Sequence, residues 1–244
     1  MGNATVSAAT EAELVSRILQ VVDRINAKTT QLQGSVDGKM HWLPPGLRDT
    51  VAAGWDRFCA ALNGWWDFWY EVATHLGSPS KVSATADAWS DLVGNPVSAQ
   101  VQSADAGMLA VDDNWDGDAA NAYRQTLPLE KTALEKVKSA LTDGISGALS
   151  DVARSIIIFW GTLIGALSAL VVGIVGALAS SATIFGLPAA PVIAAAAAAA
   201  AAAAVITGGM LLESACSSAA TTMRQRLDDN AGFIGGHWPP AATY

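Results

Sequence analysis

The longest uncharged stretch of the chain constrains its fold more than any other feature. Between Arg154 and Glu213 lie 58 residues without a single Asp, Glu, Lys, Arg or His. The first part, residues 156–179, has only Thr162 and Ser168 as polar interruptions. As a helix it would be about 36 Å long, which exceeds the ~30 Å hydrocarbon core of a bilayer. We therefore predict an apolar helix of membrane-spanning length here.

A second apolar stretch follows a loop over residues 180–191. It covers residues 192–212 and includes eleven consecutive alanines. Alanine is the best helix former, but its methyl group offers little apolar area to drive insertion into lipid. The two stretches together predict an apolar helical hairpin over residues 155–230. Gly208 and Gly209 are expected to loosen the end of its second helix.

Two interpretations of this hairpin remain open at the level of sequence. A helix that is apolar on all sides either crosses a membrane or is buried in a large core. Insertion is favoured by Phe159 and Trp160 near the start of the first helix, where aromatic side chains meet the membrane interface. The alternative is a soluble hairpin buried in a bundle or an oligomer. Either way, small residues at every fourth position predict a helix-packing face: Gly161, Gly165, Ala169, Gly173 and Ala177.

Composition narrows the class of protein further. The 244 residues are 51% hydrophobic and only 15% charged, against about 25% charged in typical soluble domains, which excludes an intrinsically disordered chain. The net charge of -8 argues against nucleic acid as a partner, because a phosphate backbone needs a basic surface. Charged residues interrupt the first 35 positions, so we expect no cleavable signal peptide.

The first 77 residues are predicted to form a pair of amphipathic helices. Apolar residues recur at helical spacing over residues 5–33, and Gly34 and Gly38 are expected to end this helix. Residues 46–76 form the second helix. We interpret its aromatic face as a helix–helix core, with a partner-binding face or a membrane-interface belt as the alternatives. This face consists of Trp55, Phe58, Trp65, Trp66 and Trp69.

The middle of the chain is predicted to form two helices around a polar turn. Helical periodicity runs over residues 81–113, with a kink or an interruption at Pro96, and resumes over residues 119–152. The turn between them is rich in aspartate. Asp116 or Asp118 is expected to cap the second helix, because a carboxylate accepts from the free N–H groups of a first turn.

No segment has the pattern of a β-strand, since alternating β-branched runs bounded by hairpin turns are missing from the sequence. We therefore predict an all-α protein built from long helical hairpins that form a bundle. It divides into an aromatic helical pair (1–77), a helical hairpin (78–154), an apolar helical hairpin (155–230) and an irregular tail (231–244).

The polar turn carries a recognisable motif. Trp115, Asp116 and Gly117 form a Trp-X-Gly sequence, and Tyr123 follows six residues after the glycine. Trp89 lies in the helix before the turn. This pattern resembles the WXG family of type VII (ESX-like) secretion substrates. Members of that family are helical hairpins that pair into four-helix bundles, typically in actinobacteria and other Gram-positive bacteria.

The resemblance covers about residues 78–150 and implies a non-enzymatic, secreted helical protein. Such a protein would pair with a small WXG-family partner or with itself, and it would engage the secretion machinery through Trp115, Gly117, Tyr123 and Trp89. The chain departs from the family in its export signal. The family pattern Y-x-x-x-[DE] is missing, because the fourth residue after Tyr123 is Leu127. Export would then rely on a partner's signal, or the chain would not be exported.

The resemblance and the apolar hairpin together suggest a type VII secretion-associated protein that inserts its hairpin into a membrane. We expect it to be secreted by that system, membrane-associated, or both. The alternative is an integral membrane protein unrelated to secretion, such as a pore-forming, holin-like or anchor protein.

Residues that carry catalysis or bind metals are sparse. His41, His75 and His237 have no Cys or carboxylate partner at ligand spacing, and Cys59 and Cys216 form no disulfide framework. The P-loop, H-E-x-x-H and G-x-S-x-G motifs do not occur. We therefore expect no catalytic residue, no metal site and no cofactor.

Overall fold

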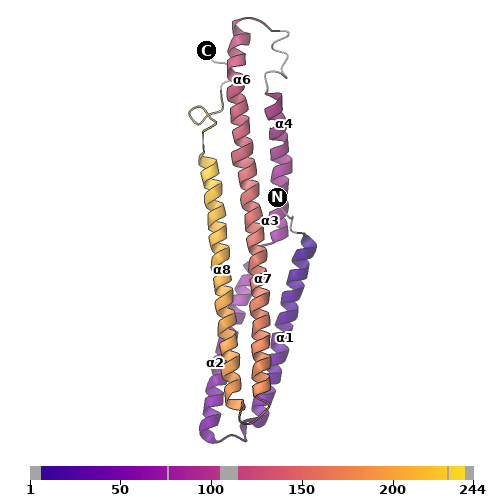
Figure 1. The fold of residues 1–244 in the computed structure, drawn as a ribbon, viewed down its shortest axis with the longest axis vertical. Coiled ribbons are helices and arrows are strands. Elements are labelled where there is room, and N and C mark those ends of the chain that lie inside the picture. Colours follow the sequence, from indigo (N-terminus) through magenta and orange to yellow (C-terminus); the bar gives the residue numbers. More distant parts are fainter. Residues whose placement is uncertain (1–6, 76, 105–114, 230, 240–244) are drawn as a thin grey trace. The chain divides into compact units, whose positions relative to one another are not determined.

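The structure is a computed structural model in which every described regular element is a helix (Figure 1), and this confirms the all-α fold class. The residues that it describes are 7–75, 77–104, 115–229 and 231–239.

The chain forms two compact units. The apolar unit contains Ser7–Ser78 and Ser155–Glu213, and the polar unit contains Pro79–Arg154 and the segment that begins at Ser214. The boundaries predicted after residues 77 and 154 lie within one residue of these divisions. The predicted apolar hairpin, in contrast, is divided after residue 213, so that its two ends belong to different units.

The apolar unit begins with two long helices, α1 (Ala8–Met40) and α2 (Pro45–His75). Ser7 caps α1, because its Oγ accepts a hydrogen bond from the backbone N–H of Thr10 at 3.1 Å. Pro45 opens α2, at a position where its missing N–H costs no helical hydrogen bond.

The prediction that Gly34 and Gly38 end the first helix is wrong, since α1 continues to Met40. A glycine inside a helix costs only about 1 kcal/mol relative to alanine. Leu32 and Val36 lie on the same part of α1 and are 0% and 2% exposed, and burial of their side chains offsets that cost.

The apolar hairpin is formed by α7 (Asp143–Ser180) and α8 (Ala190–Asp228). Both helices extend beyond the predicted stretches, and α8 passes through Gly208 and Gly209 without ending, so the prediction that they loosen it is wrong. A Cβ atom on Gly208 would lie 3.2 Å from Cγ2 of Thr162. Glycine thus allows α8 to approach α7 closely, and this packing stabilises the helix around it.

The core of the apolar unit follows the helical repeat on each of its helices. On α1 the buried residues are seven, seven and four positions apart, which is the spacing of a stripe that faces a bundle core. The same kind of stripe occurs on α2, α7 and α8. The buried side chains include Ile18, Ile25, Leu32 and Val36 of α1, Val51, Phe58, Leu62 and Trp65 of α2, Leu163, Leu167, Leu170 and Ile174 of α7, and Ala194, Ala198, Ala201 and Val205 of α8.

The polar unit contains α3 (Pro79–Trp89), α4 (Asn95–Ser103) and α6 (Asp118–Lys136), together with the start of α7 and the end of α8. Two π-helical segments connect these helices. The segment η1 (Ser90–Gly94) joins α3 to α4, and η3 (Val137–Thr142) joins α6 to α7.

The regular α-helix is interrupted just before Pro96 by the π-helical segment η1, which directly precedes α4. Pro96 then lies in the first turn of α4, where a residue without an N–H group is tolerated. The last part of the helix predicted over residues 81–113 falls on residues 105–114, which lie outside the described residues.

Candidate functional site

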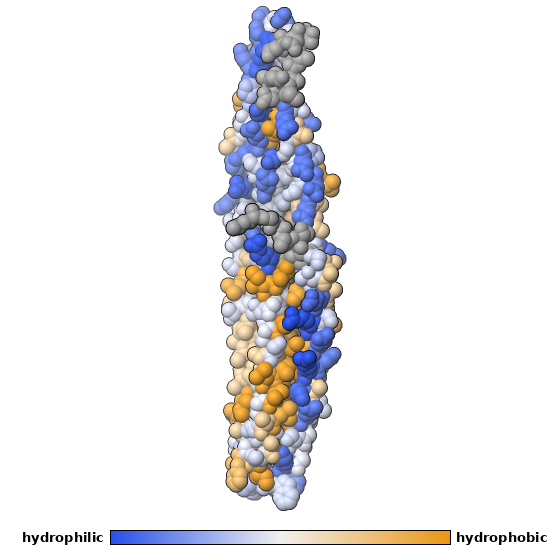
Figure 2. All heavy atoms as spheres, turned by 45° about the vertical axis from the view of Figure 1, so that its right-hand side comes forward, coloured by the Kyte–Doolittle hydropathy of each residue, from blue (hydrophilic) through white to orange (hydrophobic). Residues whose placement is uncertain are grey.

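The apolar hairpin exposes one of its sides. On α7, Ile158, Val172 and Val175 are 60%, 70% and 44% exposed, although a helix in a closed core would bury them. On α8 the exposed side chains include Val192, Ile193, Ile206, Met210 and Leu211. We call these eight residues the exposed hairpin face. In the apolar unit, Figure 2 shows apolar side chains gathered in a band beside a band of hydrophilic ones.

The small residues predicted to form one packing face do not share one environment: the first three are open to solvent, and the last two are packed. A Cβ atom on Gly161 or Gly165 would meet no atom within 4 Å, and Ala169 is exposed. A Cβ on Gly173, in contrast, would lie 2.1 Å from Cβ of Ala197 on α8, and Ala177 is 0% exposed. A row of every fourth residue turns by about 40° per step around a straight helix. The row therefore begins on the exposed side of α7 and ends against α8.

The aromatic face of α2 lies partly in the core. Phe58 and Trp65 are 0% and 4% exposed, and Trp55, Trp66 and Trp69 are half-buried. The rings of Trp65 and Trp69 are stacked at 5.9 Å, Trp66 meets Trp65 edge-on at 4.6 Å, and Trp55 packs against Phe58 at 5.5 Å. The structure thus brings the predicted aromatic residues into two neighbouring clusters along one helix.

Two indole groups of the apolar unit are buried without a hydrogen-bond acceptor among the described residues. They are Nε1 of Trp65 on α2 and Nε1 of Trp160 on α7. Trp160 is only 3% exposed. A buried donor without an acceptor costs roughly 1–3 kcal/mol. The apolar unit therefore buries the indole N–H of Trp160, near the start of the uncharged block, at an energetic cost.

The Trp-Asp-Gly turn lies in the polar unit at the start of α6. Gly117 is the N-cap residue and has φ 107° and ψ -177°, a conformation that is essentially restricted to glycine. The rings of Trp115 and Tyr123 are 5.8 Å apart. Nη2 of Arg124 donates to the carbonyl oxygen of Trp115 at 3.2 Å, which fixes the turn against the helix. Trp115 remains 43% exposed.

The prediction that Asp116 or Asp118 caps α6 is wrong, because the N-cap position belongs to Gly117 and no side chain makes a cap hydrogen bond. Backbone geometry decides this outcome. The turn needs a residue with positive φ immediately before the helix, and an aspartate would be strained there.

Trp89 is placed apart from the ring pair of the turn. It is half-buried at the end of α3, and its Nε1 donates to the carbonyl oxygen of Leu141 in η3 at 3.1 Å. Of the four residues predicted to form the recognition turn, the structure brings Trp115, Gly117 and Tyr123 together. It gives Trp89 a role in packing between helices.

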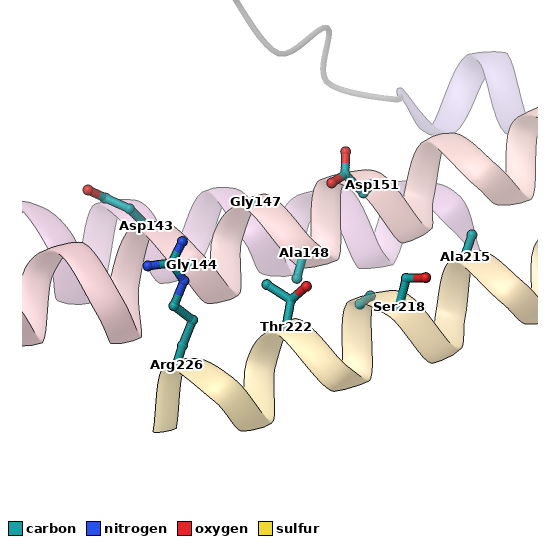
Figure 3. A pocket seen from close by; sticks show the side chains of 10 residues that line it. Asp143, Gly144, Gly147, Ala148, Asp151, Ala215, Ser218, Thr222 and Arg226 are labelled. Atoms are coloured by element: carbon teal, nitrogen blue, oxygen red, sulfur yellow. The ribbon is translucent and has the colours of Figure 1, made fainter. Parts of the chain in front are cut away.

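The polar unit contains a groove of about 430 Å³ that the sequence patterns did not predict (Figure 3). It lies between the start of α7 and the end of α8, and its walls are mainly small side chains. Asp143, Asp151 and Arg226 also line it. A signal was available, because small residues recur three or four positions apart on both helices: Gly144, Gly147 and Ala148, and Ala215, Ser218, Ala219 and Thr222.

Metal ligands are not grouped in the part of the chain that the structure describes, where no three His, Cys, Asp or Glu side chains are placed to hold one ion.

Comparison of the chain with protein-family models, with curated proteins and with solved structures finds no match.

Proposed function

We propose that the protein is a non-enzymatic helical protein that inserts its apolar hairpin into a membrane. The observation that carries this proposal is the exposed hairpin face. It lies within 58 consecutive uncharged residues, on two helices that are long and apolar enough to cross a bilayer. Transfer of exposed Val, Ile, Leu and Met side chains from water to lipid is favourable by roughly 1.5–3 kcal/mol for each side chain that becomes fully buried.

The packing of the apolar unit suggests how a soluble form is maintained before insertion. Helices α1 and α2 contribute the buried stripes that face the hairpin core, and their outer sides carry the charges. Insertion would exchange these contacts for lipid. Trp160 lies near the start of the uncharged block, so its indole N–H would reach the polar interface and gain an acceptor there.

A charge placed on the exposed hairpin face tests the proposal. Val172 lies near the middle of the first apolar stretch and is 70% exposed, so Val172→Asp is expected to leave the soluble fold intact. In a bilayer the same aspartate costs about 2.5–3.5 kcal/mol near the helix centre. We expect the wild-type protein to resist carbonate extraction from the membranes of expressing cells and the variant to be extracted.

The matched control is Leu19→Asp, which changes a 54% exposed leucine on α1 of the same unit. It is expected to behave like the wild-type chain. Equal resistance of Val172→Asp and wild type to extraction would contradict insertion. Recovery of the wild-type chain only in the soluble fraction would also contradict it, and would favour a bundle or oligomer that covers the hairpin.

Self-association of inserted hairpins is supported by the small residues at the exposed start of the row. Gly161 and Gly165 have open space around them, and small residues let helices approach closely in lipid. We expect Gly165→Leu to leave the soluble fold unchanged and to reduce cross-linked oligomers in membranes. Oligomers that persist unchanged would exclude this contact and the pore-forming alternative built on it.

We further propose that the Trp-Asp-Gly turn serves recognition in type VII secretion, by a small WXG-family partner or by the secretion machinery. The supporting observation is the exposed side chain of Trp115. Its ring contacts the ring of Tyr123, and its backbone carbonyl accepts from Arg124, just before the conformation that requires Gly117. Trp115→Ala is expected to lower export from a host with this system. The control is Leu92→Ala, because Leu92 is a 76% exposed residue of the same unit. Equal export of both variants would contradict this role.

A further inference from the structure

One end of the apolar unit brings together two connections that are far apart in sequence. Ser35 near the end of α1 shares a hydrogen bond of 2.8 Å with Ser181, which directly follows α7. Nζ of Lys39 donates to the carbonyl oxygen of the same serine. On the other side of the loop, a Cβ atom on Gly54 of α2 would lie 3.0 Å from Cβ of Pro191. The α1–α2 turn and the α7–α8 loop are therefore fixed beside each other.

This end presents large apolar side chains to solvent. Phe185 in the α7–α8 loop is 98% exposed, and its neighbour Ile184 is 47% exposed. In the α1–α2 turn and the start of α2, Trp42 and Leu47 are 66% and 43% exposed. We call these four residues the apolar tip. Figure 1 shows both connections at the same end of the apolar unit.

The α7–α8 loop is uncharged and makes hydrogen bonds within itself. Several of its polar groups bond to each other: Oγ of Ser180 donates to the carbonyl of Gly186 at 2.8 Å, and the N–H of Gly186 donates to Oγ1 of Thr183 at 3.1 Å. The N–H of Leu187, at the start of the 3-10 turn η4 (Leu187–Ala189), donates to the carbonyl of Thr183 at 3.1 Å.

Internal hydrogen bonds lower the cost of moving this loop out of water, because unsatisfied backbone groups cost several kcal/mol each in hydrocarbon. A fully exposed phenylalanine at its apex adds apolar area where the two membrane-length helices meet.

We propose that the apolar tip is the part of the molecule that first enters a lipid bilayer. Phe185 and Ile184 penetrate the acyl-chain region, and Trp42 lies at the level of the headgroups, where its indole is both apolar and hydrogen-bonded. This inference rests on the proposed insertion of the hairpin and specifies its lipid-contacting end. The bilayer is the occupant because the loop carries no charged residue, exposes apolar side chains at its apex and joins two helices of membrane-spanning length.

An environment-sensitive label reports contact with lipid directly. In a chain whose Cys59 and Cys216 are replaced by serine, Phe185→Cys is labelled with a nitrobenzoxadiazole dye and mixed with vesicles of phosphatidylcholine and phosphatidylglycerol. We expect a blue shift and a rise in emission on mixing. The same label at Leu19→Cys, on an exposed position of α1 in the same unit, is expected to respond much less.

Removal of the apolar side chain gives the second measurement. Phe185→Ser is expected to lower the vesicle partition coefficient about tenfold or more, because a buried phenylalanine side chain contributes roughly that factor. Leu19→Ser is the control and is expected to bind like wild type. The folded bundle should be unaffected by either change, since both side chains project into solvent.

The outcomes separate the tip from the hairpin. If Phe185→Ser binds and resists carbonate extraction like wild type, the tip proposal is overturned while insertion of the hairpin stands. If the wild type does not bind vesicles and Phe185→Ser converts an oligomer in solution to monomer, the tip contacts a second copy of the chain. Both proposals are then overturned. If Phe185→Ser loses binding and Val172→Asp binds vesicles without insertion, docking and insertion are two steps, as proposed.

Discussion

A Cβ atom on Gly94 would lie 2.7 Å from the Cγ2 methyl of Thr142, so the two π-helical segments of the polar unit meet at a point where only glycine fits. Gly94 ends η1 and Thr142 ends η3. Beside this contact, the indole of Trp89 donates to the carbonyl of Leu141. Irregular helical turns thus occur where two helices are in close contact, and not at random positions.

Gly94→Ala is expected to lower the free energy of unfolding by about 1–3 kcal/mol, because overpacking forces the neighbouring side chain or backbone to move. Thr142→Ser removes the obstructing methyl group and keeps the hydroxyl, so the double variant should recover most of the loss. The measurement is urea-induced unfolding. Gly147→Ala on α7 is the control: it has open space, and it is expected to gain about 0.5–1 kcal/mol. A similar loss in both variants would rule out the contact as the cause.

The contact between Gly173 and Ala197 predicts a second loss of stability. Gly173→Ala would place two Cβ atoms at 2.1 Å, so α7 and α8 would have to separate. We expect a destabilisation of about 1–3 kcal/mol in thermal unfolding of the soluble form, partly reversed by Ala197→Gly. Gly165→Ala, earlier in the same row, is expected to be neutral or stabilising because nothing lies near it. An equal effect at both glycines would contradict the division of the row.

Gly117→Ala is expected to destabilise the Trp-Asp-Gly turn by about 1–3 kcal/mol, since the φ of 107° is strained for any residue with a Cβ. No neighbouring atom would obstruct the methyl group, so the loss reports backbone strain alone. Unfolding measurements give the stability, and the NMR contact between the rings of Trp115 and Tyr123 reports the turn itself. An unchanged ring contact together with full stability would show that the turn does not need this conformation.

The pKa of Asp229 is lowered below 3.8, first because its carboxylate accepts a hydrogen bond from Lys136 and then because it accepts from the backbone N–H of Ala231. A lowered pKa contributes stability that is present above the ordinary carboxyl pKa and is lost as the pH falls through the lower folded value. Carboxyl carbon NMR should show a titration midpoint below 3.8. Lys136→Met should raise this midpoint, whereas Lys138→Met should leave it unchanged. A midpoint insensitive to Lys136 would contradict the assignment.

The helical fold was predictable because its signals are repeated over many residues. Apolar residues at helical spacing indicated helix along the long helical regions, and a 58-residue stretch without charge identified the hairpin. The separation expected between residues 152 and 156 is wrong, because α7 continues through it from Asp143 to Ser180. Gly34 and Gly208 were misjudged because intrinsic propensity was weighed without tertiary packing. Each costs about 1 kcal/mol in a helix. Burial of Leu32 and Val36 offsets this cost at Gly34, and close packing against Thr162 offsets it at Gly208.

Features that depend on contact between distant segments were not predictable from the sequence. The row of small residues appears as one face when counted in fours, but its drift around the helix becomes decisive only when the position of α8 is known. The hydrogen bond between Ser35 and Ser181 joins residues 146 positions apart, and no local pattern indicates it. The glycine in the Trp-Asp-Gly turn, in contrast, could be predicted, because its role is local.

The apolar unit is built from two separated segments of the chain, Ser7–Ser78 and Ser155–Glu213, and the first of them is synthesised well before the second. Helices α1 and α2 leave the ribosome before the hairpin, and the partner of Ser35 follows 146 residues later. At about 5–20 residues per second this interval is roughly 7–30 s. During this interval the apolar stripes of α1 and α2 remain exposed to solvent. Because the contacts of the bundle join residues far apart in sequence, its folding is expected to be slow. The more apolar hairpin is synthesised after α1 and α2, so the helices that cover its core are already present when it emerges.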